Sequence, residues 1–212
     1  MDIPINIRER VSWAIEFAWR ITLHKICNDE IQVNKEASLQ LHYSSILKDI
    51  LGLIKFSHQE KFSLQLESTA KVLERPFIID ILLCYSNSEV SEKHAIELKF
   101  YRTLAASGKN RGANDIFMYA VYYDLYITEQ YIKFRQADLT TCLILTDYEN
   151  FVNPKRKTSK NWTYDISHDF KVSPNRFTTP IGGKSVDFSL DLGYHFIWTK
   201  QGNFWSTLLR PG

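Results

Sequence analysis

Cysteine, long apolar runs and a leader segment are all scarce or missing in this sequence. Its 212 residues include only three cysteines, Cys27, Cys84 and Cys142, which are widely spaced and form no CxxC pair. An odd number of separated cysteines predicts no disulfide framework, so we expect a reducing compartment. No run approaches the roughly 20 apolar residues that a membrane span needs, and residues 1–10 lack a signal-peptide core. The sequence therefore predicts a cytoplasmic protein without a membrane partner.

Several catalytic signatures are absent as well. The sequence has no Walker A loop, no GxGxxG after a strand, no GxSxG elbow and no HExxH motif. Its six histidines are scattered without zinc-ligand spacing. The formal net charge of +2 leaves a polyanionic partner open, because a polyanion responds to the field of one face rather than to the total charge.

Hydrophobic periodicity predicts alternating helices and strands. Helices are expected over 7–27, over 34–53 with Asn34 as a cap, and over 113–134. Strands are expected over 61–68, 77–85, 94–101 and 140–146. The inner stripe of the third helix is predicted to be Ile116, Tyr119, Ala120, Tyr123 and Ile127.

The last third of the chain reads as rich in strands. A strand pair is expected over 186–192 and 194–199, turned near Gly193, followed by a strand over 204–209. The predicted fold class is α/β, with one mixed central sheet flanked by helices and a β-rich C-terminal extension. We expect one domain over 1–212, with a core at about 34–146 and the extension at about 147–212.

The most informative residue is Asp80, which interrupts the apolar run FIIDILL. A carboxylate in a central strand is costly to desolvate unless its charge is offset, and a bound cation would offset it. An Asp at a sheet end, or one satisfied by an Arg or a backbone donor, is the structural alternative. Asp80 alone leaves both interpretations open.

Glu97 and Lys99 follow in the next predicted strand, in the segment HAIELKFY. Residues two apart on a strand point to the same face, so these two side chains project together. An exposed ion pair gives the same spacing, so this motif alone is not specific. Together with Asp80 it places two carboxylates and an ammonium at neighbouring strand positions. Such oxygen ligands suit Mg²⁺, which can activate water for phosphodiester hydrolysis, and a nearby Lys can stabilise the transition state.

Asp80 followed by Glu97-Leu98-Lys99 resembles the PD-(D/E)XK nuclease superfamily, which includes many restriction enzymes and repair nucleases. The helix, three strands, helix and strand from about 34 to 146 are similar to that family's αβββαβ core. The sequence departs from the family at the Pro that often precedes the Asp directly, because here it is Pro76. The resemblance covers roughly half of the chain and implies a restriction-endonuclease-like fold with Mg²⁺, or Mn²⁺ as a substitute, as cofactor.

The resemblance also implies an acidic residue on the helix before the first core strand, and Glu36 fits by position. Gln40 lies one turn later on the same face, and Asp115 and Tyr119 lie near the start of the next helix, so these three could support the site. The alternatives are a dipole-favouring role for Glu36 and capping or core packing for Asp115 and Tyr119. Glu67 is expected to face solvent.

Two basic loops are candidates for phosphate contacts. The first carries Lys109 and Arg111 and follows Arg102; the second carries Lys155, Arg156, Lys157 and Lys160. Solvated surface loops are the alternative interpretation of both. Phosphate contacts would supply affinity rather than sequence readout.

The sequence therefore predicts a Mg²⁺-dependent nuclease acting on nucleic acid, preferably DNA, with a restriction-like or defence-associated role by analogy. Asp80 and Glu97 would hold the metal, Lys99 would assist the attacking water, and Glu36 would complete the site. Many relatives are dimers, so a homodimer is expected. The alternatives are a non-catalytic nucleic-acid-binding or assembly module, and an unrelated α/β binding protein whose Asp80 and Glu97 lie far apart.

Overall fold

The computed structural model describes residues 2–72, 74–104, 108, 112 and 114–211. The larger elements are α1 (Ile7–Cys27), α2 (Glu36–Leu53), β1 (Lys61–Val72), β2 (Arg75–Ser86), β3 (Ser91–Tyr101), α3 (Asn114–Lys133) and β4 (Leu139–Thr146). The smaller ones are α4 (Glu149–Val152), the 3₁₀ turn η1 (Lys160–Tyr164), β5 (Phe170–Val172), β6 (Asn175–Phe177), β7 (Phe188–Leu190), β8 (Tyr194–Phe196), β9 (Thr199–Gln201) and β10 (Phe204–Leu209). The predicted succession up to β4 is confirmed, although β1 continues four residues beyond its predicted end at 68.

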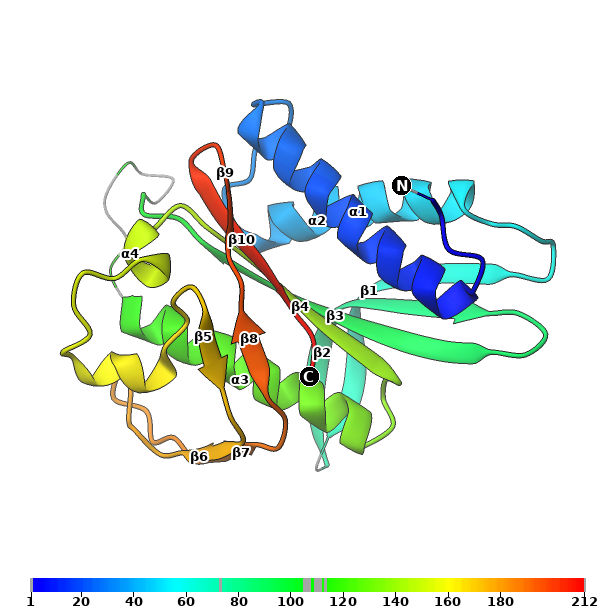
Figure 1. The fold of residues 1–212 in the computed structure, drawn as a ribbon. Coiled ribbons are helices and arrows are strands. Elements are labelled where there is room, and N and C mark those ends of the chain that lie inside the picture. Colours follow the sequence, from blue (N-terminus) through cyan, green and yellow to red (C-terminus); the bar gives the residue numbers. More distant parts are fainter. Residues whose placement is uncertain (1, 73, 105–107, 109–111, 113, 212) are drawn as a thin grey trace.

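Six strands form a mixed sheet in the order β1-β2-β3-β4-β10-β9. All neighbouring pairs are antiparallel except β3 and β4, which run parallel. A parallel pair needs a crossover connection, and α3 lies in the connection between these two strands. Figure 1 shows α1 and α2 on one side of this sheet and α3 on the other. The chain is thus an α/β protein with a mixed central sheet flanked by helices.

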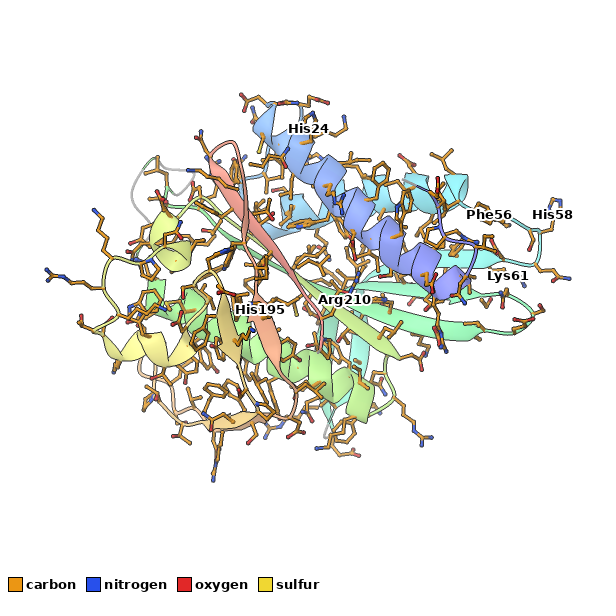
Figure 2. The ribbon with its side chains drawn as sticks, in the orientation of Figure 1. His24, Phe56, His58, Lys61, His195 and Arg210 are labelled. Atoms are coloured by element: carbon orange, nitrogen blue, oxygen red, sulfur yellow. The ribbon has the colours of Figure 1, made fainter. Side chains whose placement is uncertain are left out.

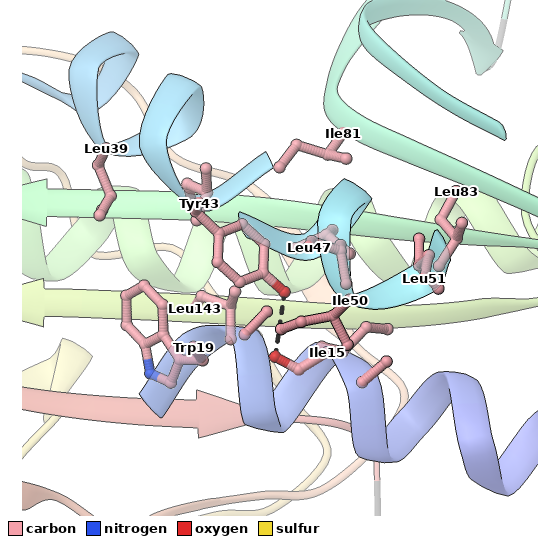
Figure 3. Close-up of a cluster of buried hydrophobic side chains, with 14 of the residues drawn as sticks. Ile15, Trp19, Leu39, Tyr43, Leu47, Ile50, Leu51, Ile81, Leu83 and Leu143 are labelled. Carbon is pink, nitrogen blue, oxygen red and sulfur yellow. Dashed lines mark hydrogen bonds between the residues drawn. The ribbon is translucent and has the colours of Figure 1, made fainter. Parts of the chain in front are cut away.

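The core on the α1 and α2 side is aliphatic with a few aromatic residues (Figure 3). Leu98 of β3 is fully buried there with Leu47 of α2 and Ile15 of α1, as strand alternation requires. Tyr43 donates a hydrogen bond to the carbonyl oxygen of Ile15 at 3.2 Å, which joins the two helices. Burying each large aliphatic side chain contributes roughly 1.5–3 kcal/mol, so this layer holds α2 firmly against β3.

Helix α3 is buried on two sides, and its predicted inner stripe is wrong. Ile116 is 40% exposed and Tyr119 is half-buried, whereas Phe117, Val121 and Leu125 are buried. The other residues of the predicted stripe are half-buried, at Ala120 and Tyr123, or buried, at Ile127. Aromatic residues of the C-terminal strands cover the side of α3 that faces away from the sheet, so hydrophobicity alone does not mark the face toward the sheet.

The predicted pairing of strands around Gly193 is also wrong. β7 pairs with β6 and β8 pairs with β5, so the two strands flanking Gly193 belong to different sheets. The carboxylate of Glu129 on α3 accepts the N–H groups of Asp191 and Leu192 at 2.7 and 3.1 Å and fixes this turn. The Glu129 carboxylate therefore accepts hydrogen bonds from backbone N–H groups that could otherwise have paired in a hairpin.

The end of the chain returns to the central sheet. β10 pairs with β4, and the hairpin to β9 turns at Gly202, whose φ of 55° suits glycine. Arg210 (Figure 2) donates to Glu16 of α1 at 2.8 Å and to Thr141 of β4 at 3.2 Å. The predicted extension thus supplies two strands of the sheet.

The N-terminal ends of α1 and α2 are fixed by polar contacts. Arg10 of α1 is fully buried, forms an ion pair with Glu60 and places its guanidinium 4.0 Å above the ring of Phe56. The prediction that Asn34 caps α2 is wrong, because Lys35 is the N-cap residue. The hydroxyl oxygen of Ser38 accepts the N–H groups of Asn34 and Lys35 at 3.1 and 3.2 Å, so the Asn34 side chain is not needed there.

Across the described residues, no helix combines the length and the apolar character that crossing a membrane requires.

Candidate active site

The candidate site lies where β2 and β3 part. Their pairing runs from Ser86 opposite Ser91 to Ile81 opposite Ile96, and Asp80 and Glu97 are the next residue on each strand. Beyond this point the backbone N–H of Leu98 donates to Asp80 Oδ2 at 2.7 Å. A side-chain carboxylate therefore replaces the strand carbonyl that an uninterrupted ladder would provide.

The same substitution occurs two residues further along β3. The N–H of Phe100 donates to Glu36 Oε2 at 3.1 Å, which brings the first turn of α2 to the open edge of β3. On β1, Glu67 is exposed and has a φ of 51°, and it lies between the pairs that join Leu66 to Ile81 and Ser68 to Ile79. The sheet is thus distorted on both sides of Asp80.

The structure brings Asp80 and Glu97 together. Their carboxyl groups are close enough for each to shift the pKa of the other. Burial raises the pKa of Glu97 well above its ordinary value, and the nearby charges of Asp80 and Asp124 raise it further. Burial also raises the pKa of Asp80, although its bond from the Leu98 N–H opposes this. The interpretation in which these two carboxyls lie far apart is wrong.

Lys99 is held between two carboxylates. Its Nζ lies 2.9 Å from Asp124 Oδ2 on α3 and 3.5 Å from Glu36 Oε1 on α2. Burial by itself lowers the pKa of Lys99, but Asp124 and Glu36 together raise it above its ordinary value. With a side chain only 20% exposed, Lys99 is a fixed cation rather than half of a surface pair.

Asp124 is the residue that sequence reasoning missed. Burial raises its pKa to about 7, Lys99 opposes this shift, and the charges of Glu36 and Asp80 add to it. The signal available in the sequence is that Asp124 is the one acid inside the apolar, aromatic run YAVYYDLYI. Tyr119, one of the predicted supporting residues on the same helix, instead stacks against Tyr123.

The other predicted supporting residues have different surroundings. Gln40 is buried and its Nε2 donates to the backbone carbonyl of Asp80 at 2.6 Å, so it fixes the chain at the site. Glu36 and Gln40 reach the site from one face of α2, as expected. Asp115 is half-buried near the start of α3, and among the described residues it forms no ion pair with Lys99.

Two of the predicted phosphate-binding residues, Arg102 and Lys157, are held by acidic partners. Lys109 and Arg111 lie outside the described residues. Arg102 lies 3.5 Å from Asp147 and stacks over Phe204 at 5.8 Å. In the second basic loop, Lys157 donates to Asp165 at 2.6 Å, so this residue is a structural cation rather than a free phosphate ligand.

The charge balance of the site fits a bound cation. Among the described residues, four carboxyls, from Glu36, Asp80, Glu97 and Asp124, lie around one ammonium, that of Lys99. Glu97 Oε1 is buried and has no hydrogen-bond partner within the part of the chain that the structure describes. An unpartnered carboxylate oxygen beside a second carboxylate is a suitable pair of ligands for Mg²⁺, which keeps several waters.

This arrangement is a two-carboxylate site, not a cage of protein ligands. Over the described ranges, no group of three or more His, Cys, Asp or Glu side chains is arranged to hold a metal ion. Glu36 and Asp124 contact Lys99, which leaves Asp80 and Glu97 as the carboxylates for a metal. Water and substrate oxygens would have to complete the coordination.

A groove with a volume of about 890 Å³ lies elsewhere, between α1 and the β9–β10 hairpin. Its walls are mainly apolar, and two of its charged residues, Lys25 and Glu30, pair with each other at 2.6 Å. The reactive groups therefore gather at the parting of β2 and β3, and we place the candidate site there by chemistry rather than by size.

Comparison with known proteins identifies no relative. No protein-family model, no curated protein and no solved structure matches this chain. The function must therefore be inferred from the geometry of the site.

Proposed function

We propose that this protein is a Mg²⁺-dependent nuclease that hydrolyses phosphodiester bonds in nucleic acid, preferably DNA. The observation that carries the proposal is the buried carboxyl pair of Asp80 and Glu97 beside the cation of Lys99. The arrangement at the parting of β2 and β3 supports a restriction-endonuclease-like fold and a PD-(D/E)XK type of site. A restriction-like or defence-associated role remains an analogy.

Each residue has a separate task in this proposal. Asp80 and Glu97 would hold the metal, which when bound supplies a Lewis acid and lowers the pKa of water. Lys99 places a fixed positive charge where negative charge develops on the phosphate. Glu36 and Asp124 hold the Lys99 ammonium from two helices, and Gln40 holds the backbone at Asp80.

The burial of these groups explains why a cation should matter. Without one, the site concentrates carboxyl groups whose pKa values are raised by burial and by one another. A divalent ion would favour the ionised forms of Asp80 and Glu97 and so release protons on binding. Proton release on addition of Mg²⁺ is therefore a direct sign of the site.

Cleavage of supercoiled, linear and single-stranded DNA in Mg²⁺ or Mn²⁺ tests the proposal. Asp80→Asn, Glu97→Gln and Lys99→Met should each reduce the cleavage rate by at least about 100-fold, because each removes a charge used at the reacting phosphate. Asp187→Asn, at an exposed position in the C-terminal extension, is the matched control and should cut like wild type.

Two results would count against the proposal. Cleavage that survives in folded Asp80→Asn and Lys99→Met proteins would remove the site assignment. If wild type binds nucleic acid but cuts none of the substrates with either metal, the non-catalytic binding module becomes the better account.

A further inference from the structure

A second charged groove lies at the other end of α2. It has a volume of about 590 Å³ and is lined by Lys48, Leu51, Gly52, Lys55, Lys61, Phe62, Ser63 and Leu64. Three lysines and no acidic side chain line it, and we call it the lysine groove. Figure 2 labels Lys61 with Phe56 and His58 at this end of the molecule, where α2 leads into β1.

The three lysines are available to a ligand. All three are exposed, and no ion pair involves any of them within the described part of the chain. The carboxyl end of α2 carries only about half a negative charge, and Asp49 adds one more. The positive charge of the three lysine ammonium groups exceeds the sum of these two negative charges, so the groove keeps a net positive charge.

The lysine groove and the candidate active site lie at opposite ends of α2, and β1, which lines the groove, pairs with β2 beside Asp80. At about 1.5 Å per residue, α2 covers about 18 Å between Glu36 and Lys48. At about 3.4 Å per residue, β1 covers about 17 Å between Leu66, which pairs beside Asp80, and Lys61. The two estimates agree. Along the axis of a duplex the phosphates of one strand are spaced by about 3.4 Å, so a duplex lying parallel to α2 would place about five nucleotides between the groove and the candidate site.

We propose that the lysine groove binds the phosphate backbone of the nucleic-acid substrate about five nucleotides from the bond that is cut. The distance to the bond that is cut rests on the proposed nuclease function, whereas binding at the groove can be measured without cleavage. A nucleic acid fits this groove because its backbone carries a regular row of negatively charged phosphates. The contact would raise affinity for extended substrates without reading their sequence.

Binding of a fluorescent 20-base-pair duplex without divalent metal tests the groove directly. The triple variant Lys48→Ala/Lys55→Ala/Lys61→Ala should lose at least about tenfold in affinity at 100 mM salt, and its slope of log K against log salt should flatten by about 2.7. The matched control is Lys171→Ala/Lys184→Ala/Lys200→Ala, which removes the same charge from exposed residues of the C-terminal extension and should bind like wild type.

Hydrolysis of bis(p-nitrophenyl) phosphate separates this inference from the nuclease proposal, because so small a diester reaches only the active site. The lysine triple variant should hydrolyse it like wild type while its KM for the duplex rises. Lysine-dependent duplex binding by a protein that cleaves nothing would support the groove and remove the nuclease. Equal duplex binding by wild type and the lysine triple variant would overturn the proposal. So would a triple variant that binds the duplex like wild type and loses only its binding to vesicles of anionic lipid. The exposed side chains of Leu53 and Phe56 could contribute to such vesicle binding.

Discussion

Replacing Asp124 by Asn changes the charge of the candidate site while keeping the shape of the side chain. In the folded protein without metal, burial raises the pKa of Asp124 to about 7, from an ordinary value of 3.8. Between these two pH values the folded protein keeps a proton that the unfolded chain has released. Stability therefore falls as pH rises through this window and is level above it.

The size of this effect follows from the pKa difference. One pKa unit corresponds to about 1.36 kcal/mol, so the shift of Asp124 amounts to a cost of about 4 kcal/mol above pH 7. The side chain is only 20% exposed, so solvent screens little of this cost. An asparagine amide has no proton to release in this range. The free energy of unfolding of the Asp124→Asn variant should therefore rise relative to that of wild type by up to about 4 kcal/mol between pH 4 and pH 7.

Urea unfolding followed by tryptophan fluorescence, in EDTA and at intervals from pH 4 to pH 8, measures this difference. Asp49→Asn is the control, because it makes the same substitution at an exposed position on α2. An Asp124→Asn curve that runs parallel to wild type over the whole range would refute the electrostatic account of the site.

Two further substitutions test how the site and the helices are held. Gln40→Ala leaves the carbonyl of Asp80 without its donor, so unfolding should become easier by about 1–3 kcal/mol and cleavage should slow, whereas Gln32→Ala at an exposed position should change neither. Arg10→Met leaves Glu60 buried without its partner and should cost about 3–5 kcal/mol at pH 7. Burial opposes ionisation of Glu60, but the N–H of Phe56 and the Arg10 guanidinium lower its pKa below the ordinary value of 4.5. The stabilisation they give is therefore present above that pH and is lost as the pH falls through the lowered pKa. The gap between Arg10→Met and wild type should narrow there in urea unfolding, and an equal gap at pH 7 and pH 3 would contradict this assignment.

The local part of the site was predictable from the sequence. Strand alternation places Glu97 and Lys99 on one face, and a lone acid in an apolar run marks Asp80. The helical spacing of Glu36 and Gln40 likewise predicts that both reach the site from one face of α2. Each of these inferences uses residues of one element or of adjacent strands.

The remaining features depend on contacts between distant parts of the chain. Asp124 reaches Lys99 only because α3 connects two parallel strands and packs against them. The sequence does not show which face of α3 turns toward the sheet, because both of its sides are apolar. The pairings of β5 to β8 involve strands of three residues, which are too short for alternation to identify partners. The three lysines of the lysine groove come from α2, the following loop and β1, so no local pattern reveals them.

The return of β10 to the sheet beside β4 affects how the protein is made. All residues of the candidate site are synthesised by the time β4 is complete, but the edge of β4 that β10 covers stays open until Phe204–Leu209 emerges. That edge is an apolar strand, LTTCLILT, and an unpaired apolar strand is a template for pairing with other chains. A nascent chain can therefore hold all residues of the candidate site while it is still prone to aggregate. Folding of the whole sheet must wait for a contact between distant segments.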